Sequence, residues 1–339
     1  MTEQDARIAQ DLVRPEAFPE ETGPATLIQT HISFVFIADE HVYKVKKAVD
    51  FGFLDFSSLE KRKHFCDAEV SLNRRLSPHV YLEVVPVTES DGRLVFGGDG
   101  EPVDWAVRMR RIPMDRQMLK LIEAGNLVEP DVRRVAETIA KFHREEPVKP
   151  ELAKFGTLET VKFNTDENFE QTTGYIDRTI TREQYDALKG YTDRFYRDRA
   201  DLLARRISDG FVKDCHGDLH LEHIILTDPV TVFDCIEFNE RFRYSDTAAD
   251  IAFLAMELDF RGRPELTKVL MDAYVTASGD PDVMGMLTFY KVYRAYVRGK
   301  VISFRLDDPN IPEDEKRKAT ESASRYFELA HSYVAEVLA

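Results

Sequence analysis

Residues 211–251 carry the stretch FVKDCHGDLHLEHIILTDPVTVFDCIEFNERFRYSDTAADI, around which the rest of the chain is organised. Two short runs rich in β-branched and aromatic residues, at 224–226 and 230–233, flank Asp228 and Pro229. Apolar runs of this length on either side of a turn dipeptide predict a tight β-hairpin.

Polar side chains gather at the open end of this predicted hairpin. A turn centred between Asp228 and Pro229 would place His223 opposite Asp234, about 5 Å apart at Cβ. Asp218 lies on the loop just before the hairpin. A carboxylate at the end of a buried strand is costly without a partner, so we interpret the cluster as a functional site rather than a solvated surface.

Composition narrows the class of protein. The 339 residues have a formal charge of −15, which argues against nucleic acid as the main partner. No apolar run reaches the length of a membrane span, and the N-terminal residues lack an apolar signal core. The three cysteines form no CxxC pair, which argues against a disulfide framework or structural zinc site. We therefore expect a cytoplasmic protein with no membrane partner.

The N-terminal third is predicted to be mostly antiparallel sheet with one helix. Residues 26–37 and 41–47 suggest a hairpin whose alternation puts Lys44 and Lys46 on one face and Tyr43 and Val45 on the other. A helix with apolar residues at helical spacing is expected at 59–76. Further strands are expected at 80–87, 94–96 and 105–109.

Helical patterns dominate the rest of the chain, and they are expected at 118–123, 130–145, 181–207, 247–259, 265–277, 283–304 and 312–337. Thr181 and Gln184 have the spacing of a capping box, whereas residues 151–180 show no decisive pattern. The fold class expected is α+β, with a small N-terminal nucleotide-binding lobe at 1–110 and a larger, mainly helical lobe with the catalytic loop and metal site at 111–339.

Several motifs together resemble the aminoglycoside phosphotransferase family, which has the two-lobed protein-kinase-like fold. The core of the match is HGDLH at 216–220, VFD at 232–234 and DIA at 250–252. YKVKK at 43–47, FLDFS at 53–57 and LNRRL at 72–76, with the HGDLHLEHI and FDCIEFN motifs, are similar to an uncharacterised bacterial branch of that family. The resemblance covers nearly the whole chain.

The resemblance implies an ATP-dependent phosphotransferase acting on a hydroxyl group of a small molecule, with ATP and Mg²⁺ as cofactors. Asp218 would orient the acceptor hydroxyl and take its proton as general base. Asp234 would bind the metal that bridges the nucleotide phosphates. Asp250 and Asp246 would brace the large lobe or the catalytic loop, and His216 and His220 would shape that loop.

Nucleotide binding is assigned by the same resemblance to the N-terminal lobe. Lys44 would contact the α- and β-phosphates and pair with Glu69, with Lys46 as the second candidate for that lysine. The strand around Met109 would lead into the hinge and frame the adenine. Because no Gly-rich loop occurs between residues 22 and 36, ordinary backbone around 29–33 would cover the phosphates.

One position departs from the family pattern. The second metal ligand of the family is an asparagine five residues after the catalytic aspartate, and here that position is His223. Imidazole suits Mn²⁺ and Zn²⁺ better than Mg²⁺. Three consequences are open: a shift toward Mn²⁺, a ligand oxygen from Glu237 or Asn239, or a hydrogen bond from His223 to Asp218.

Two functions of other classes are compatible with the residues. A metal-dependent hydrolase would use His216, Asp218, His220 and His223 to hold zinc, although it leaves Lys44 without a role. A nucleotide-binding pseudokinase is the other. Relatives of this branch often continue into a P-loop kinase domain. No GxxxxGK[ST] motif occurs in this sequence, so a P-loop kinase would have to be a separate partner protein.

Overall fold

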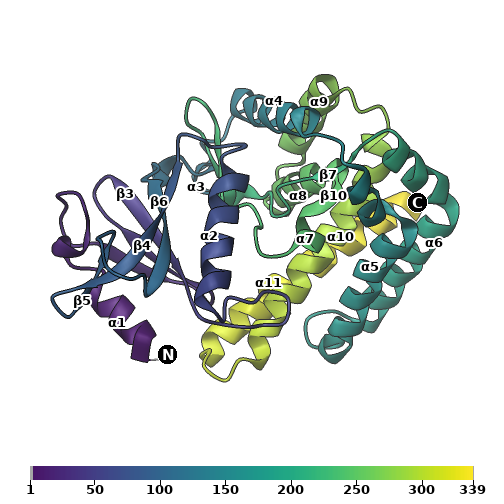
Figure 1. Cartoon of the computed structure of the whole chain (residues 1–339). Helices are drawn as coiled ribbons and strands as arrows, with labels where there is room; N and C mark the ends of the chain where they lie inside the picture. The colour runs from purple at the N-terminus through teal and green to yellow at the C-terminus, as the bar shows by residue number, and fades with distance from the viewer. Residues whose placement is uncertain (1–2, 339) are drawn as a thin grey trace. The chain divides into compact units, whose positions relative to one another are not determined.

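The computed structural model describes residues 3–338, which form two compact units (Figure 1). Unit 1 contains the residues up to Leu121 together with Glu222–Glu240, and unit 2 contains Ile122–Leu221 together with the residues from Arg241 onward. The hairpin segment therefore belongs to the same compact unit as the N-terminal residues. The boundary after residue 110 separates the expected nucleotide-binding lobe from the expected catalytic lobe, and it stays a prediction.

Unit 1 is built on a six-stranded antiparallel sheet with the order β1-β2-β3-β6-β4-β5. The strands are β1 Thr26–Gln29, β2 Ser33–Ile37, β3 His41–Lys46, β4 Tyr81–Ser90, β5 Arg93–Phe96 and β6 Asp104–Arg110. Helix α1 (Glu3–Asp11) begins the unit, and α2 (Leu59–Asn73) packs against β4 and β6 (Figure 1). An antiparallel sheet with one inserted helix is what the sequence predicted.

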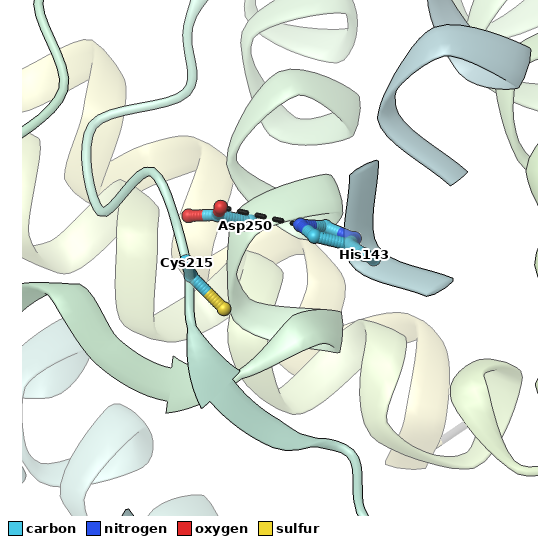
Figure 2. A group of neighbouring side chains, drawn as sticks. All are labelled: His143, Cys215 and Asp250. Atoms are coloured by element: carbon cyan, nitrogen blue, oxygen red, sulfur yellow. Dashed lines mark hydrogen bonds and ion pairs between the residues drawn. The ribbon is translucent and has the colours of Figure 1, made fainter. Parts of the chain in front are cut away.

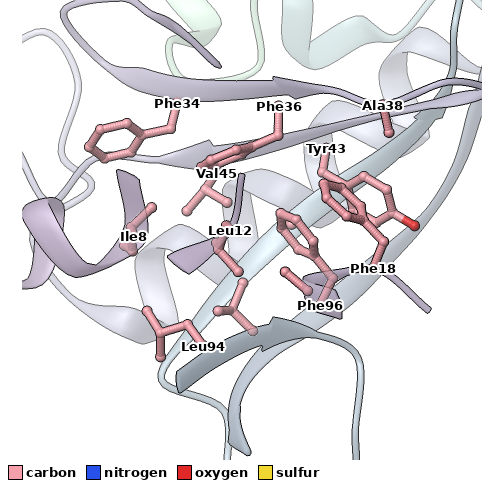
Figure 3. Close-up of a cluster of buried hydrophobic side chains, with 13 residues drawn as sticks. Ile8, Leu12, Phe18, Phe34, Phe36, Ala38, Tyr43, Val45, Leu94 and Phe96 are labelled. Carbon is pink, nitrogen blue, oxygen red and sulfur yellow. The ribbon is translucent and has the colours of Figure 1, made fainter. Parts of the chain in front are cut away.

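The two faces of the sheet have different chemistry. Tyr43 and Val45 of β3 point into an apolar core, where the ring of Tyr43 stacks on Phe96 at 4.3 Å between centroids (Figure 3). Lys44 and Lys46 point to the opposite face, as the alternation of β3 predicted. The apolar core also contains Ile8, Leu12, Phe18, Phe34, Phe36 and Leu94.

The predicted first strand at residues 26–37 is wrong in one respect, because the chain makes two strands there. Thr30 turns the chain: its hydroxyl oxygen accepts hydrogen bonds from the backbone N–H groups of Ile32 and Ser33. A threonine hydroxyl that satisfies nearby backbone donors favours a turn over a continued strand. β1 and β2 consequently pair with each other, with Gln29 opposite Phe34.

The hairpin at 224–232 is present, but its predicted register is wrong by one residue. β8 (Ile224–Ile225) and β9 (Thr231–Val232) pair Ile224 with Val232, and the backbone N–H of Phe233 donates to the carbonyl of His223. A type I′ hairpin turn needs positive φ at both central residues, which the ring of proline forbids, so a longer loop connects the strands. His223 therefore lies opposite Phe233 instead of Asp234.

Side chains from the α2–β4 connection hold this hairpin in unit 1. The hydroxyl of Ser77 donates to the carbonyl of Val232 at 2.7 Å and accepts from its N–H at 3.0 Å. His79 Nε2 lies 2.8 Å from the hydroxyl of Thr231. These contacts join segments about 150 residues apart in sequence and fix the start of the segment that carries Asp234.

Unit 2 is mainly helical, as predicted, and α10 packs against α8 and α11 (Figure 1). Its long helices are α4 Glu129–Glu145, α5 Leu158–Thr172, α6 Arg182–Ser208, α8 Thr247–Phe260, α9 Pro264–Ser278, α10 Val283–Phe304 and α11 Glu313–Leu338. The helices α3 Met118–Glu123 and α7 Glu240–Arg243 are short and both cross the unit boundary, and β7 Val212–Asp214 pairs with β10 Tyr244–Asp246. Residues 151–180 contain α5, and the capping box of Thr181 and Gln184 begins α6.

Asp246 supports unit 2 in the way expected of a bracing residue. Its carboxylate accepts from the N–H of Ala248 and so caps α8, and it pairs with Arg206 at 2.6 Å.

Within residues 3–338, no helix combines the length and the apolar character needed to cross a bilayer.

Candidate active site

Lys44 lies at the centre of a charged network in unit 1. Its Nζ is 2.9 Å from Oε1 of Glu69 on α2 and 2.7 Å from Oδ1 of Asp234. Glu69 is fully buried, whereas the side chain of Asp234 keeps 41% of its exposure. The Lys44–Glu69 pair that the resemblance implied is therefore present, and the same lysine contacts Asp234, the proposed metal ligand.

Lys46 occupies the inner part of the network. Its Nζ lies 2.5 Å from Oε2 of Glu69 and also pairs with Glu237. Lys46 and Glu69 are both buried. The two oxygens of Glu69 are thus divided between two lysines, and the more exposed lysine is the one that contacts Asp234.

The pKa values of these groups follow from burial and charge. Burial alone would lower the pKa of Lys44, but the negative charges of Asp234 and Glu69 outweigh it and raise that pKa well above the usual value. Burial would raise the pKa of Glu69, yet Lys44 and Lys46 hold it below the usual value. For Glu237, burial dominates over Lys46 and the pKa is raised. At neutral pH both lysines are charged.

Asp234 has an unusual backbone that is held on both sides. Its φ is +62°, in the left-handed region that side chains other than glycine rarely adopt. The N–H of Asp234 donates to the hydroxyl of Tyr81 at 3.0 Å, and the N–H of Cys235 donates to Oδ1 of Asn73 at 2.9 Å. A strained conformation pinned by neighbouring side chains is typical of a functional position.

The side chains of His223 and Asp234 lie close to each other although the hairpin register differs by one residue from the predicted one. Its Nε2 lies 3.7 Å from Oδ2 of Asp234. Two ligand atoms that each lie about 2.1 Å from one ion are separated by roughly 3–4 Å, so a carboxylate oxygen and an imidazole nitrogen at this distance fit a shared divalent metal. Glu237 is turned to Lys46, and the amide of Asn239 donates to the carbonyl of Phe53.

The loop at residues 216–220 of unit 2, which is predicted to carry the general base, is held by hydrogen bonds to its backbone. Oδ2 and Oδ1 of Asp250 accept from the N–H groups of His216 and Gly217 at 2.7 and 2.9 Å. Gly217 has φ of +85°, which a residue with a Cβ would adopt only under strain. The N–H of Asp218 donates to Nδ1 of His216 at 3.3 Å. Asp250 and His216 therefore act on the loop, as expected.

His220 supports the side chain of Asp218. Its Nε2 lies 3.4 Å from Oδ2 of Asp218, and its ring is buried beside Phe253. Burial would lower the pKa of His220, but the charge of Asp218 outweighs it and the pKa is raised. His220 thereby keeps one oxygen of Asp218 oriented, while the carboxylate itself stays about one-third exposed.

Met109 lies on β6 opposite Val42 and Tyr81. It is half-buried and packs on a small apolar cluster that includes Val107, against which Phe233 also packs. The structure thus places Met109 in the same unit and on the same apolar cluster as the residue preceding Asp234. Its role toward adenine stays a prediction.

Two residues that contact the loop at 216–220 or its partner Asp250 were not predicted from the sequence. Arg294 of α10 donates to the carbonyl of Gly217 at 3.0 Å, and His143 of α4 lies 3.3 Å from Asp250 (Figure 2). Both come from helices whose amphipathic pattern marks them only as core or surface positions. The sequence offers one weak signal for His143: a histidine follows Phe142 at a position on the apolar face of α4, where the structure buries it.

Comparison with known proteins identifies the family. A model described as "Phosphotransferase enzyme family" matches residues 104–287, which is 184 of 339 residues. Uncharacterized proteins of Mycobacterium tuberculosis (strain ATCC 25618 / H37Rv) and Mycobacterium bovis (strain ATCC BAA-935 / AF2122/97) are each 32% identical over 292 residues. Each alignment covers 85% of this chain and 57% of the relative, so the chain spans little more than half of these curated relatives.

Solved structures with low identity share the fold. A choline/ethanolamine kinase family protein from Mesorhizobium loti superimposes with a TM-score of 0.53 at 15% identity, covering 99% of this chain and 100% of that one. The GDP complex of aminoglycoside 2'-phosphotransferase-IIIa gives 0.54 at 14% identity, over 93% and 96%. The α+β, protein-kinase-like fold is thus confirmed, and the chain belongs to the phosphotransferase enzyme family.

Proposed function

We propose that this protein is an ATP-dependent phosphotransferase that moves the γ-phosphate to a hydroxyl group of a small molecule. The observation that carries the proposal is the Lys44 ammonium, which joins Glu69 of α2 to Asp234. A charged lysine that is held by a helix carboxylate and lies beside a potential metal ligand has the parts that phosphoryl transfer needs.

Asp234 and His223 would hold the divalent metal, which when bound neutralises the charge of the nucleotide phosphates. Lys44 would bind the α- and β-phosphates. Asp218 would orient the acceptor hydroxyl and accept its proton as the acceptor oxygen bonds to the γ-phosphorus. The bond between that phosphorus and the bridging oxygen breaks in the same step, which releases ADP.

The names of the structural neighbours support a small-molecule acceptor. One is a choline/ethanolamine kinase family protein and the other an aminoglycoside 2'-phosphotransferase in complex with GDP. Neither name selects an acceptor for this chain, so the assay should combine ATP and GTP with panels of amino alcohols, aminoglycosides and sugars.

The three free, buried cysteines are consistent with the proposed cytoplasmic setting.

Thermal unfolding with added ligands separates the candidate functions. A ligand at a hundred times its Kd adds about 2.7 kcal/mol of stability. We expect stabilisation by ATP with Mg²⁺ or Mn²⁺ together with turnover of ATP in the presence of an acceptor. Stabilisation by zinc alone would contradict the proposal in favour of a hydrolase. Nucleotide binding without turnover under any metal or acceptor would indicate a pseudokinase.

The metal preference can be tested at His223. The proposed metal is Mg²⁺, with Mn²⁺ as the second candidate because His223 contributes an imidazole nitrogen. If His223 is a ligand, His223→Asn should keep activity and raise the ratio of Mg²⁺-dependent to Mn²⁺-dependent turnover. An unchanged ratio, or a loss that neither metal restores, would count against His223 as a ligand.

A further inference from the structure

The turn between β1 and β2 is short and carries its own hydrogen bonds. The N–H of Thr30 donates to the carbonyl of Ser33 at 2.9 Å. The hydroxyl oxygen of Thr30 accepts from the N–H groups of Ile32 and Ser33 at 3.3 and 3.0 Å. Residues 30–33 therefore form a closed turn, which differs from a Gly-rich loop, because glycine can change its φ and ψ at little cost.

Lys47, directly after β3, contacts this turn through its side chain and its backbone. Its Nζ donates to the carbonyl of Thr30 at 2.7 Å and lies 3.5 Å from Oε1 of Gln29. Its backbone N–H donates to the carbonyl of Ile32 at 2.8 Å. The ammonium also lies 4.6 Å from the centre of the ring of Phe34, a residue of the apolar core. One lysine thus joins two carbonyls of the turn to the sheet.

The turn adjoins the face of the sheet that carries Lys44. β2 pairs with β3 so that Ser33 lies opposite Lys46 and Val35 lies opposite Lys44. Directly opposed residues of an antiparallel pair point to the same face, so β2 leaves the turn on the face of the two lysines. A turn at this place can cover the phosphates of a nucleotide bound at Lys44, as the family resemblance implies.

Two interpretations of Lys47 are possible. A lysine at the end of a strand is commonly a solvated surface residue, whose ammonium faces water. The ammonium of Lys47 instead lies among a carbonyl, a side-chain amide and an aromatic ring. Ordering a mobile loop when a ligand binds costs conformational entropy, and a loop that is already fixed avoids this cost. The contacts of Lys47 therefore favour a role in fixing the turn.

We propose that Lys47 is a positioning residue that fixes the turn at 30–33 over the nucleotide phosphates before the nucleotide binds. The proposal rests on the proposed function, because it takes this turn as the cover of the phosphates. Lys47 touches neither the phosphates nor the metal in this role. It strengthens nucleotide binding, and the transfer step at Asp218 does not depend on it.

Matched substitutions at Lys47 and Thr30 test this role. Lys47→Met keeps much of the apolar side chain and removes the donor to Thr30, whereas Lys47→Arg keeps a donor. We expect Lys47→Met to raise the KM for ATP by roughly 2- to 10-fold, the worth of one hydrogen bond, with an unchanged kcat. Lys47→Arg should recover most of this loss. Thr30→Val, which removes the acceptor of two N–H groups, should raise the KM in the same way, whereas Thr30→Ser and the surface change Lys63→Met should not.

Amide hydrogen exchange at Ile32 and Ser33, measured without nucleotide, provides a readout that does not depend on activity. We expect both amides to exchange faster in Lys47→Met and Thr30→Val than in wild type, and near the wild-type rate in Lys47→Arg and Thr30→Ser. Equal exchange and equal KM in all variants would overturn the proposal, as would a loss of kcat with an unchanged KM. If wild type binds no ATP in calorimetry, the proposed function fails, while the exchange rates still decide whether Lys47 fixes the turn.

Discussion

The residues predicted to act in catalysis fall into two groups, one in each unit, and the two groups are held by different kinds of contact. In unit 1, Lys44, Lys46, Glu69, Asp234 and Glu237 hold one another through charged side chains. In unit 2, the loop that carries Asp218 is held mainly through its backbone. Side-chain ion pairs can exchange partners when a charged ligand arrives, whereas backbone hydrogen bonds keep one geometry. We infer that the group in unit 1 adapts to nucleotide and metal, whereas the group in unit 2 stays fixed.

Within unit 1, removing the charge of Lys46 should have the largest effect on stability. Lys46→Met should destabilise the protein by about 3–5 kcal/mol, because Glu237 and one oxygen of Glu69 would be left buried without their cation. The free energy of unfolding in urea measures the loss.

The control for Lys46→Met is Lys63→Met, since Lys63 pairs with Asp67 at the surface. That change should cost less than about 1 kcal/mol. Adding Glu237→Leu to Lys46→Met should restore part of the stability. Equal, small losses for both lysines would show that the inner ion pairs do not hold the site.

Lys44 is expected to affect ligand binding more than stability. Its partner Asp234 is partly exposed, and Glu69 keeps Lys46 when Lys44 is lost. Lys44→Met should weaken binding of ATP with Mg²⁺ by about 1.5–3 kcal/mol, the range for a hydrogen bond to a charged group. Isothermal titration calorimetry of wild type, Lys44→Met and Lys63→Met tests this, and equal affinities would remove Lys44 from the nucleotide site.

In unit 2, the carboxylate of Asp250 should make the stability of the protein sensitive to acid. Burial would raise the pKa of Asp250, but the hydrogen bond from His143 and the positive charges of His143, His216 and Arg294 outweigh it and lower the pKa to about 2. Because the folded-state pKa is below the unfolded value near 3.8, this stabilisation is present above pH 4 and is lost as the pH falls toward 2.

The shift of pKa corresponds to about 2 kcal/mol. We therefore expect the unfolding free energy to fall between pH 4 and pH 2, and to fall less steeply in Asp250→Asn. Unfolding in urea at each pH measures both slopes. Parallel slopes would mean that Asp250 carries no stabilising charge.

Local patterns predicted the parts of the site that depend on local geometry. The period of two along β3 put Lys44 and Lys46 on one face, whereas the pairing of Lys44 with Glu69 was implied by the family resemblance. The hairpin was predicted as an element, but its register was wrong because the turn at Asp228 and Pro229 is longer than the pattern suggests.

The rest depends on contacts between distant parts of the chain. Lys46 and Glu237 are 191 residues apart, and His143 and Asp250 are 107 apart. No local periodicity encodes such pairs, because each partner looks like an ordinary helix, strand or loop residue in its own segment. Resemblance to a family supplied the predicted roles of Asp218 and Asp234. It did not predict the contacts of His143 and Arg294, and it suggested Glu237 only as a metal ligand, not as the partner of Lys46.

Formation of a phosphorylated product by wild type and by Asp218→Asn tests the central claim most directly. With saturating ATP and Mg²⁺ and an acceptor found in the panel, we expect wild type to yield the phosphorylated acceptor, detected by mass spectrometry. Asp218→Asn should bind nucleotide with unchanged affinity and form product roughly 10²–10⁴-fold more slowly, the usual worth of a general base. Equal rates of product formation in the two proteins would contradict the account.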